Sequence, residues 1–257
     1  MGILNVTPDS FYDGGLYKND VEILNKVEIM LNEGATFIDV GAYSSRPNAV
    51  HISEDDELKR IIPIVELILN KFPETLFSID TFRSKIARNC IEAGAAMIND
   101  ISAGKMDSNM LHTIADLRVP YIMMHMKGTP QTMQKQTNYE NLLKEVLFYF
   151  SERIAAARQF GIVDIIVDPG FGFSKTVSQN YELINKMRHL NMLELPILVG
   201  VSRKSMIYKV LENSPNEALN GSTVLNTIAL QKGASILRVH DVKEAVECIK
   251  LTSQLNS

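Results

Sequence analysis

Short runs of apolar residues recur along the chain, and amphipathic stretches separate them. The runs are rich in β-branched residues and predict eight strands, at 2–6, 37–41, 76–80, 96–100, 121–124, 165–168, 197–201 and 236–239. The stretches between them have helical spacing, as at 84–93 and at 20–32. In 20–32 we expect the apolar face to consist of Val21, Leu24, Val27, Ile29 and Leu31. The predicted order is strand, helix, strand, helix.

The predicted strands are apolar throughout rather than alternating, which is typical of parallel strands covered by helices on their faces. Eight such units favour an α/β fold of the closed (β/α)8 barrel type, the TIM barrel. Several helices are followed by a glycine that suits a helix C-terminus, namely Gly34, Gly94, Gly161 and Gly233. No low-complexity linker divides the chain, so we expect one domain over 1–257.

Composition narrows the classes of partner. The chain has 257 residues, of which 46% are apolar and 22% charged, with a formal net charge of −4 and no run of five like charges. This balance gives no basic surface for nucleic acid or an anionic membrane. No apolar stretch is long enough to span a bilayer. Cys90 and Cys248 lie among apolar neighbours and suit buried thiols in a reducing compartment, so we expect a cytoplasmic protein.

Every predicted strand ends in polar residues, and in a (β/α)8 barrel this end of the strands carries the chemistry. In chain order these residues are Asn5, Asp39, Asp80, Asn99 with Asp100, His125, Asp168, Ser202 with Arg203 and Lys204, and Arg238 with His240. Helix capping is an equally good interpretation of Asp39 or Asp100 taken singly. Eight polar strand ends together favour a binding site.

The chemistry of these side chains indicates two kinds of ligand group. Carboxylates at 80 and 168, the amide at 99 and the ammonium at 204 match the donors and acceptors of an amino-oxo heterocycle. Asn5, Arg238 and His240 suit a phosphate or diphosphate accompanied by a magnesium ion.

The motifs around these positions resemble the dihydropteroate synthase family of pterin-binding barrels, from the first residue to about residue 246. They are Asn5-Val6-Thr7-Pro8-Asp9-Ser10-Phe11, Asp39-Val40-Gly41 with Ser44-Ser45-Arg46-Pro47, Ser78-Ile79-Asp80-Thr81, Ile98-Asn99-Asp100, Met124-His125-Met126-Lys127-Gly128, Asp168-Pro169-Gly170-Phe171-Gly172-Phe173, Ser202-Arg203-Lys204 and Arg238-Val239-His240. A single motif is moderately specific, whereas this many in one order make an accidental resemblance very improbable.

The resemblance implies a transferase of folate biosynthesis that belongs to the sulfonamide target class. Such an enzyme condenses 6-hydroxymethyl-7,8-dihydropterin diphosphate with 4-aminobenzoate, giving 7,8-dihydropteroate and pyrophosphate. It implies a pterin site at Asp80, Asn99, Asp168 and Lys204, of which Asp80, Asp168 and Lys204 are expected to be catalytic, and a diphosphate site at Asn5, Arg238 and His240. It further implies Mg²⁺ as cofactor with Asn5 as its ligand, and a homodimer formed through the late helices.

The resemblance places 4-aminobenzoate on the second loop and its surroundings. The implied residues are Ser45, Arg46, Pro47, Phe173 and Ser205, together with Lys204. The loops 7–18 and 43–53 are long for simple connections and are expected to close over the bound diphosphate.

Several features depart from the family pattern. Tyr43, Ser45 and Asn48 stand where many members have glutamate, threonine and glycine, which puts aminobenzoate affinity and sulfonamide sensitivity in question. The sequence begins inside the first strand, where members usually have a preceding segment, and we expect this to affect stability more than chemistry.

Two other functions remain open. A pterin-binding methyltransferase barrel shares the Asp-Asn-Asp pattern but needs neither the loop at 45–47 nor the run at 202–204. A catalytically silent barrel subunit is expected to have lost some of the strand-end residues, and none is lost.

The remaining conspicuous residues have structural interpretations. We expect His51, His112 and His189 to be surface residues, and His125 to line a pocket rather than to act in catalysis. Arg203 is expected to pair with a neighbouring acid. Lys204 resembles a Schiff-base lysine in its position, but nearby carboxylates are expected to keep it protonated.

Overall fold

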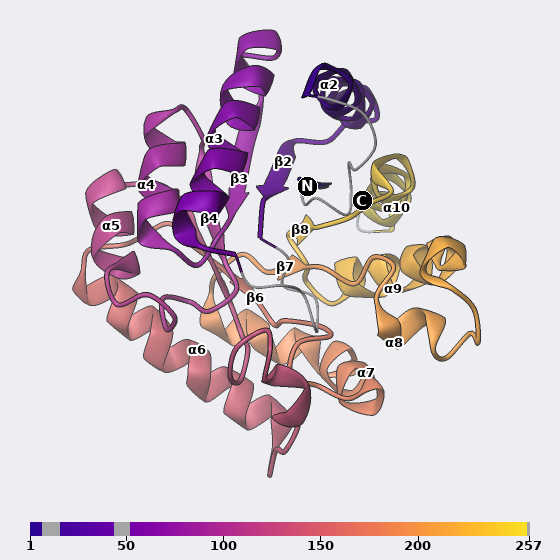
Figure 1. The fold of residues 1–257 in the computed structure, drawn as a ribbon. Helices are drawn as coiled ribbons and strands as arrows, with labels where there is room; N and C mark the ends of the chain where they lie inside the picture. Colours follow the sequence, from indigo (N-terminus) through magenta and orange to yellow (C-terminus); the bar gives the residue numbers. More distant parts are fainter. Residues whose placement is uncertain (7–15, 44–51, 256–257) are drawn as a thin grey trace.

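The computed structural model describes residues 1–6, 16–43 and 52–255, and in it strands and helices alternate (Figure 1). The strands are β1 (Gly2–Asn5), β2 (Phe37–Gly41), β3 (Leu76–Asp80), β4 (Met97–Asp100), β5 (Tyr121–Met124), β6 (Ile165–Asp168), β7 (Leu198–Val199) and β8 (Ile236–Leu237). The α-helices are α2 (Leu16–Asn32), α3 (Glu54–Lys71), α4 (Ser84–Glu92), α5 (Met110–Leu117), α6 (Leu142–Gln159), α7 (Val177–Asn185), α8 (Ser205–Tyr208), α9 (Leu219–Gln231) and α10 (Val242–Gln254). Short 3₁₀ segments follow at Met133–Lys135, Met187–Leu193 and Pro215–Glu217.

The strands form a closed barrel. β1 to β6 pair in parallel in chain order, and β7 pairs in parallel with β8. A parallel bridge between Val167 and Ile197 joins β6 to the segment of β7, and another between Gly2 and Val239 joins the end of β8 to β1. The amide of Ile3 donates to the carbonyl of Val239 at 2.9 Å across this seam. The predicted (β/α)8 architecture is therefore confirmed.

The last two strands are shorter than predicted. β7 and β8 each contain two residues, whereas the sequence indicated 197–201 and 236–239. After Val199 the chain leaves the ladder, and the amide of Lys204 closes a turn on the carbonyl of Val201 at 3.1 Å. Val201 and Val239 lie beyond the two-residue strands and remain buried, which accounts for the longer apolar runs in the sequence. Val239 still pairs with β1 through its bridge to Gly2.

Helix ends follow the expected chemistry. Gly34 and Gly94 close α2 and α4 with φ values of +99° and +111°, which glycine adopts without strain. Ser53 caps α3 through its hydroxyl, which accepts from the amide of Asp56 at 3.1 Å. These caps fix where each helix returns to the barrel.

The predicted apolar face of α2 was partly wrong. The helix begins at Leu16 rather than at residue 20, and its buried residues are Ile23, Val27 and Met30. Val21 and Ile29, assigned to that face, are 57% and 56% exposed. Positions 23, 27 and 30 recur at steps of four and three and so share one side of a helix, which 21 and 29 do not.

The core lies between the strands and the surrounding helices, and both cysteines are free and buried within it, as predicted. Burial raises the pKa of the Cys90 thiol to about 12, so this thiol is unreactive at neutral pH. Among the described residues, no helix combines the length and the apolar character that crossing a membrane requires.

Candidate active site at the carboxyl ends of the strands

A chain of polar contacts crosses the barrel where its strands end. Arg238, directly after β8, donates from Nε to Oδ2 of Asp39 at 2.6 Å and from Nη2 to Oδ2 of Asp80 at 2.9 Å. Asn99 on β4 donates from Nδ2 to the same Oδ2 of Asp39 at 3.2 Å. The structure therefore brings the predicted residues Asp80, Asn99 and Arg238 together. Asp39 joins Asn99 to Arg238, and Arg238 joins this pair to Asp80.

Asp39 is the main residue of this cluster that sequence reasoning undervalued. Its side chain is fully buried, and Oδ1 has no hydrogen-bond partner among the described residues. A buried carboxylate is tolerated when it is paired, and the Arg238 guanidinium supplies that pairing. The capping interpretation is wrong for Asp39. The sequence feature that could have shown this is the position of Asp39 inside the strand, between the apolar residues Ile38 and Val40.

Asp80 ends β3 beside the guanidinium and is less buried than Asp39. Burial raises the pKa of the Asp80 carboxyl to about 7, against the attraction of Arg238, which lowers it. The repulsion of Asp39 adds to the rise. Asp80 can therefore change its protonation state near neutral pH.

Asp168 and Lys204 form a second cluster on the β6 and β7 side. Asp168 is buried, and its Oδ1 accepts from the amide of Gly170 at 2.8 Å. Lys204 donates from Nζ to the carbonyl of Phe171 at 2.5 Å, and Nζ lies 4.8 Å from the centre of the Phe173 ring. Three of the predicted pterin residues thus lie at the ends of β3, β4 and β6, and the fourth, Lys204, lies in the turn between β7 and α8.

The charges of this second cluster stabilise each other against burial. Burial lowers the pKa of Lys204 to about 8, opposed by Asp168, and it raises the pKa of Asp168, opposed by Lys204. At pH 7 the amine is therefore still mainly protonated, as expected. An ammonium at this position is a hydrogen-bond donor rather than a nucleophile.

The predicted diphosphate-binding residues Asn5, Arg238 and His240 lie at the ends of β1 and β8. Oγ of Ser202 lies 3.1 Å from Nδ1 of His240. Partial burial of the ring, and next the charge of Arg238, lower the pKa of His240 to about 4, so the imidazole is neutral at pH 7, although the residue keeps an exposed surface. Asn5 ends β1, and Ser205 opens the four-residue helix α8.

Arg203 forms the predicted ion pair, with Asp241, at 3.0 and 2.5 Å.

The second loop is described at its two flanks. Ser45, Arg46 and Pro47 lie outside the described residues, as do Asn48 and His51 and most of the first loop. On one flank, the Tyr43 ring centre lies 5.5 Å from the Arg83 guanidinium carbon, and on the other, Arg83 donates to the carbonyl of Ile52 at 2.6 Å. Arg83 is held by the buried Glu57 at 2.5 Å, an ion pair that sequence reasoning missed.

Other strand-end residues have structural roles. The Oδ1 atom of Asp100 accepts from the amide of Ser102, and Oδ2 accepts from the hydroxyl of Tyr121, so this carboxylate holds the turn after β4. It does not cap α5, whose N-cap residue is Asn109, so the capping interpretation is wrong for Asp100 as well. His112 and His189 are exposed, as predicted.

His125 is buried and lines a cavity of about 350 Å³ together with Lys127 and Glu145, so the expectation of pocket lining is confirmed. That cavity lies between the segment after β5 and α6, and none of the pterin-site candidates lines it. We therefore place the active-site candidate at the strand ends, where the buried charges converge.

The described part of the chain offers few ligands for a metal ion. Among the described residues, no group of three or more His, Cys, Asp or Glu side chains could hold a metal ion. The amide of Asn5 is a hard oxygen donor, and Mg²⁺ commonly takes few protein ligands and completes its shell with water and substrate phosphate. The donor set therefore fits magnesium that arrives with a diphosphate.

Comparison with known proteins gives a consistent result. Residues 1–240 match the family model described as pterin binding enzyme. Dihydropteroate synthase of Escherichia coli (strain K12) is 44% identical over 253 residues, covering 98% of this chain and 89% of that protein. The Yersinia pestis dihydropteroate synthase, solved with a sulfonamide drug complex, superposes with a TM-score of 0.93 at 40% identity, covering 99% of this chain and 93% of the other.

A second solved relative adds a ligand. The Xanthomonas albilineans dihydropteroate synthase, solved with 4-aminobenzoic acid, has a TM-score of 0.92 at 36% identity and covers 100% of this chain and 92% of the other. Identity of this extent over nearly the whole chain, with the same fold, shows descent from one ancestor. The chain belongs to the dihydropteroate synthase family of pterin-binding enzymes.

Proposed function

We propose that the protein condenses 6-hydroxymethyl-7,8-dihydropterin diphosphate with 4-aminobenzoate, giving 7,8-dihydropteroate and pyrophosphate for folate synthesis. The observation that carries this proposal is the convergence of four side chains at one end of a barrel with this ancestry: the buried carboxylate of Asp168, the partly buried carboxylate of Asp80, the amide of Asn99 and the ammonium of Lys204.

The pterin site follows from hydrogen-bond chemistry. A pterin carries an amino group and ring N–H groups that donate, and a carbonyl and ring nitrogens that accept. Asp168 and Asp80 accept from the donors, the Lys204 ammonium donates to the carbonyl, and the Asn99 amide does either. Because these groups are largely buried, a heterocycle that leaves one of them unpaired binds weakly.

The diphosphate belongs on the side of Asn5, Arg238 and His240. Arg238 uses Nε and Nη2 for Asp39 and Asp80, and among the described residues Nη1 has no partner, so it is the donor available to an anion. The neutral His240 imidazole donates through its ring N–H. Magnesium, held by Asn5 and phosphate oxygens, would supply further neutralisation of charge on the leaving group.

The reaction is then a dissociative displacement. The bond between the pterin methylene carbon and the diphosphate oxygen breaks first, and the electron pair leaves with pyrophosphate. The positive charge left on the carbon spreads into the pterin ring, where the carboxylates of Asp80 and Asp168 stabilise it. The amine of 4-aminobenzoate forms the new carbon–nitrogen bond and then loses a proton to solvent. No covalent enzyme intermediate is required.

The aminobenzoate is a weak nucleophile that needs orientation more than activation. We place it against Phe173 and Ser205, with Ser45, Arg46 and Pro47 completing the site from the second loop. The solved relative with 4-aminobenzoic acid supports this ligand class. Arg83 contacts Tyr43 and Ile52, the described residues on either side of that loop.

The remaining assignments belong to the same proposal. We expect one pterin-binding domain over 1–257, acting in the cytoplasm on small-molecule substrates. We also expect a homodimer, supported by exposed apolar residues on and near the late helices, including Val224, Ile249 and Leu251. Light scattering of the purified protein should therefore give twice the mass of one chain, and a single-chain mass would contradict the dimer.

Release of pyrophosphate by purified protein tests the function. With the dihydropterin diphosphate and magnesium, 4-aminobenzoate should accelerate release, and mass spectrometry should find 7,8-dihydropteroate. Lys204→Met and Asp168→Asn should each reduce turnover at least about 100-fold, since each removes charge from the site. Lys186→Met, at an exposed lysine directly after α7, should leave turnover unchanged. Methyl transfer without pyrophosphate release would favour a methyltransferase barrel. Absence of both pterin diphosphate binding and pyrophosphate release would favour a silent subunit.

A further inference from the structure

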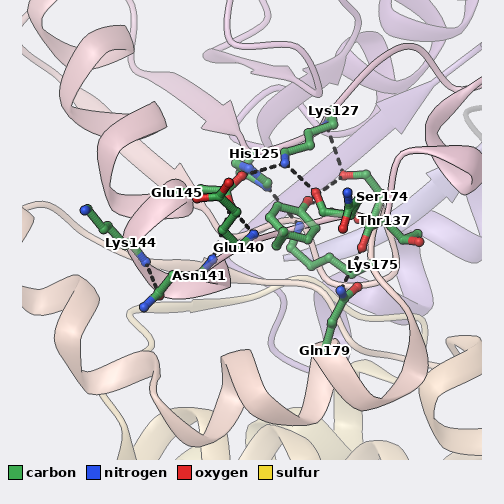
Figure 2. A network of polar contacts seen from close by, with 12 residues as sticks. His125, Lys127, Thr137, Glu140, Asn141, Lys144, Glu145, Ser174, Lys175 and Gln179 are labelled. Carbon is green, nitrogen blue, oxygen red and sulfur yellow. Dashed lines mark hydrogen bonds and ion pairs between the residues drawn. The ribbon is translucent and has the colours of Figure 1, made fainter.

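Lys175 lies just before α7 and is almost entirely buried, with 4% of its surface exposed. Its Nζ donates to the carbonyls of Gly170 and Phe173, each at 3.0 Å, and lies 3.0 Å from Nδ1 of His125 (Figure 2). In its protonated form the Lys175 amine has three N–H donors, and these contacts engage all of them. Burial lowers the pKa of Lys175 to about 7, opposed by the charge of Asp168. Because an unpaired buried cation is costly, this complete set of acceptors marks a position shaped around the lysine.

The turn that Lys175 holds, 170–173, also contacts the proposed pterin residues. The amide of Gly170 donates to Asp168, and the carbonyl of Phe171 accepts from Lys204. Lys175 therefore binds two carbonyls of the same turn that orients Asp168 and Lys204. A change at Lys175 reaches the site through this turn.

The turn packs directly on the segment after β5. Gly170 has a φ of +69°, and a Cβ atom there would lie 2.1 Å from the carbonyl oxygen of His125, so a side chain cannot fit. The His125 ring is fixed in turn by Tyr149, whose ring centre lies 4.8 Å away. Burial and the charge of Lys175 lower the pKa of His125 well below its usual value, which leaves Nδ1 of the neutral ring able to accept.

We propose that Lys175 is a positioning residue for the pterin site, which acts with His125 to hold the turn 170–173 so that Asp168 and Lys204 meet the ligand. The inference rests on the proposed function of the strand-end cluster. Lys175 thus contributes to substrate binding through the turn 170–173 and does not contact the ligand itself.

The test compares neutral variants at two lysines of the network in Figure 2. Lys175→Met keeps the length of the side chain and removes all three donors, and Lys175→Gln restores two N–H donors. The matched control is Lys127→Met, because Lys127 donates to Glu145 at 2.6 Å and to the carbonyl of Asn138 at 2.8 Å, outside the turn. Titration calorimetry measures the Kd for the dihydropterin diphosphate, and circular dichroism checks folding.

We expect Lys175→Met to weaken pterin binding at least about tenfold, since it strands buried acceptors in the turn. Lys175→Gln should recover part of that loss, and Lys127→Met should bind as the unaltered protein does. Folded Lys175→Met with unchanged pterin affinity would overturn the inference. Failure of both Lys175 variants to fold would also overturn it, because the lysine would then hold the fold itself. Absence of pterin binding by the unaltered protein would instead contradict the proposed function.

Discussion

At the scale of single residues, buried charge organises the site. Arg238 lies between Asp39 and Asp80, and Lys204 is held near Asp168, so cation and carboxylate side chains alternate around the mouth of the barrel. In a low-dielectric site such pairs keep their geometry without solvent rearrangement, which is the condition for stabilising a developing cation and a departing diphosphate together.

Asp39→Asn tests whether the buried ion pair between Asp39 and Arg238 stabilises the folded protein. Removing one partner of a buried ion pair leaves an uncompensated charge, here on Arg238, and we expect a loss of about 3–5 kcal/mol in the free energy of unfolding. Urea unfolding measures it. Asp55→Asn, at an exposed carboxylate paired with Lys85, is the matched control and should leave the unfolding midpoint unchanged. Equal stability of the two variants would show that Asp39 is not part of a coupled pair.

The pH dependence of pterin binding follows from two side chains. Asp80 must be ionised to accept an N–H, so affinity should rise as pH increases through about 7. Lys204 must be protonated to donate, so affinity should fall as pH increases through about 8. The expected profile is bell-shaped, and it is measurable as Kd from pH 6 to 9.

The guanidinium of Lys204→Arg keeps its charge across that range. The falling limb of the profile should therefore move to higher pH in this variant, whatever the affinity at the optimum. If the falling limb stays near pH 8 in Lys204→Arg, the loss of affinity comes from titration of another group and not of Lys204.

What the sequence could predict at this scale was the residue types at the strand ends. Their pairing was not predictable, because Arg238 and Asp39 are far apart in the chain and meet only through barrel closure. Lys175 was missed for the same reason: its three acceptors come from a turn and from a different strand end, and a lone lysine ahead of a helix has no distinctive pattern.

At the scale of elements, the pattern of apolar residues predicted the strands accurately but did not identify the buried face of helix α2. Apolar runs bounded by polar residues predicted β2, β3, β5 and β6 to the residue. In α2, apolar residues occur all around the helix, so composition alone could not identify the side that faces the barrel.

A pair of substitutions in α2 tests this face. Ile23→Ala should cost about 2–5 kcal/mol in the free energy of unfolding, because the side chain is 3% exposed and its removal leaves a cavity. Ile29→Ala, the matched change on the exposed side, should shift the urea midpoint little. Comparable losses from the two substitutions would contradict the assignment of Ile23, Val27 and Met30 to the core.

At the scale of the whole molecule, closure of the barrel is what turns dispersed residues into one site. The bridges Gly2–Val239 and Val167–Ile197 bring the ends of β8 and β1, and of β6 and β7, together. Arg238 can then contact β2 and β3, and Lys204 can contact the turn after β6. Neither contact forms in an open sheet.

The most direct measurement is the Kd of the dihydropterin diphosphate for the unaltered protein and for Asn99→Ala. Asn99 is buried, lies within the cluster and is not itself charged, so its loss tests the site without removing an ion pair. We predict specific binding that weakens about ten- to 100-fold in Asn99→Ala, since buried groups of the site and ligand lose their partner. Asn70→Ala, on the exposed side of α3, should bind normally. Equal affinity of Asn99→Ala and Asn70→Ala would contradict a pterin site at the strand ends.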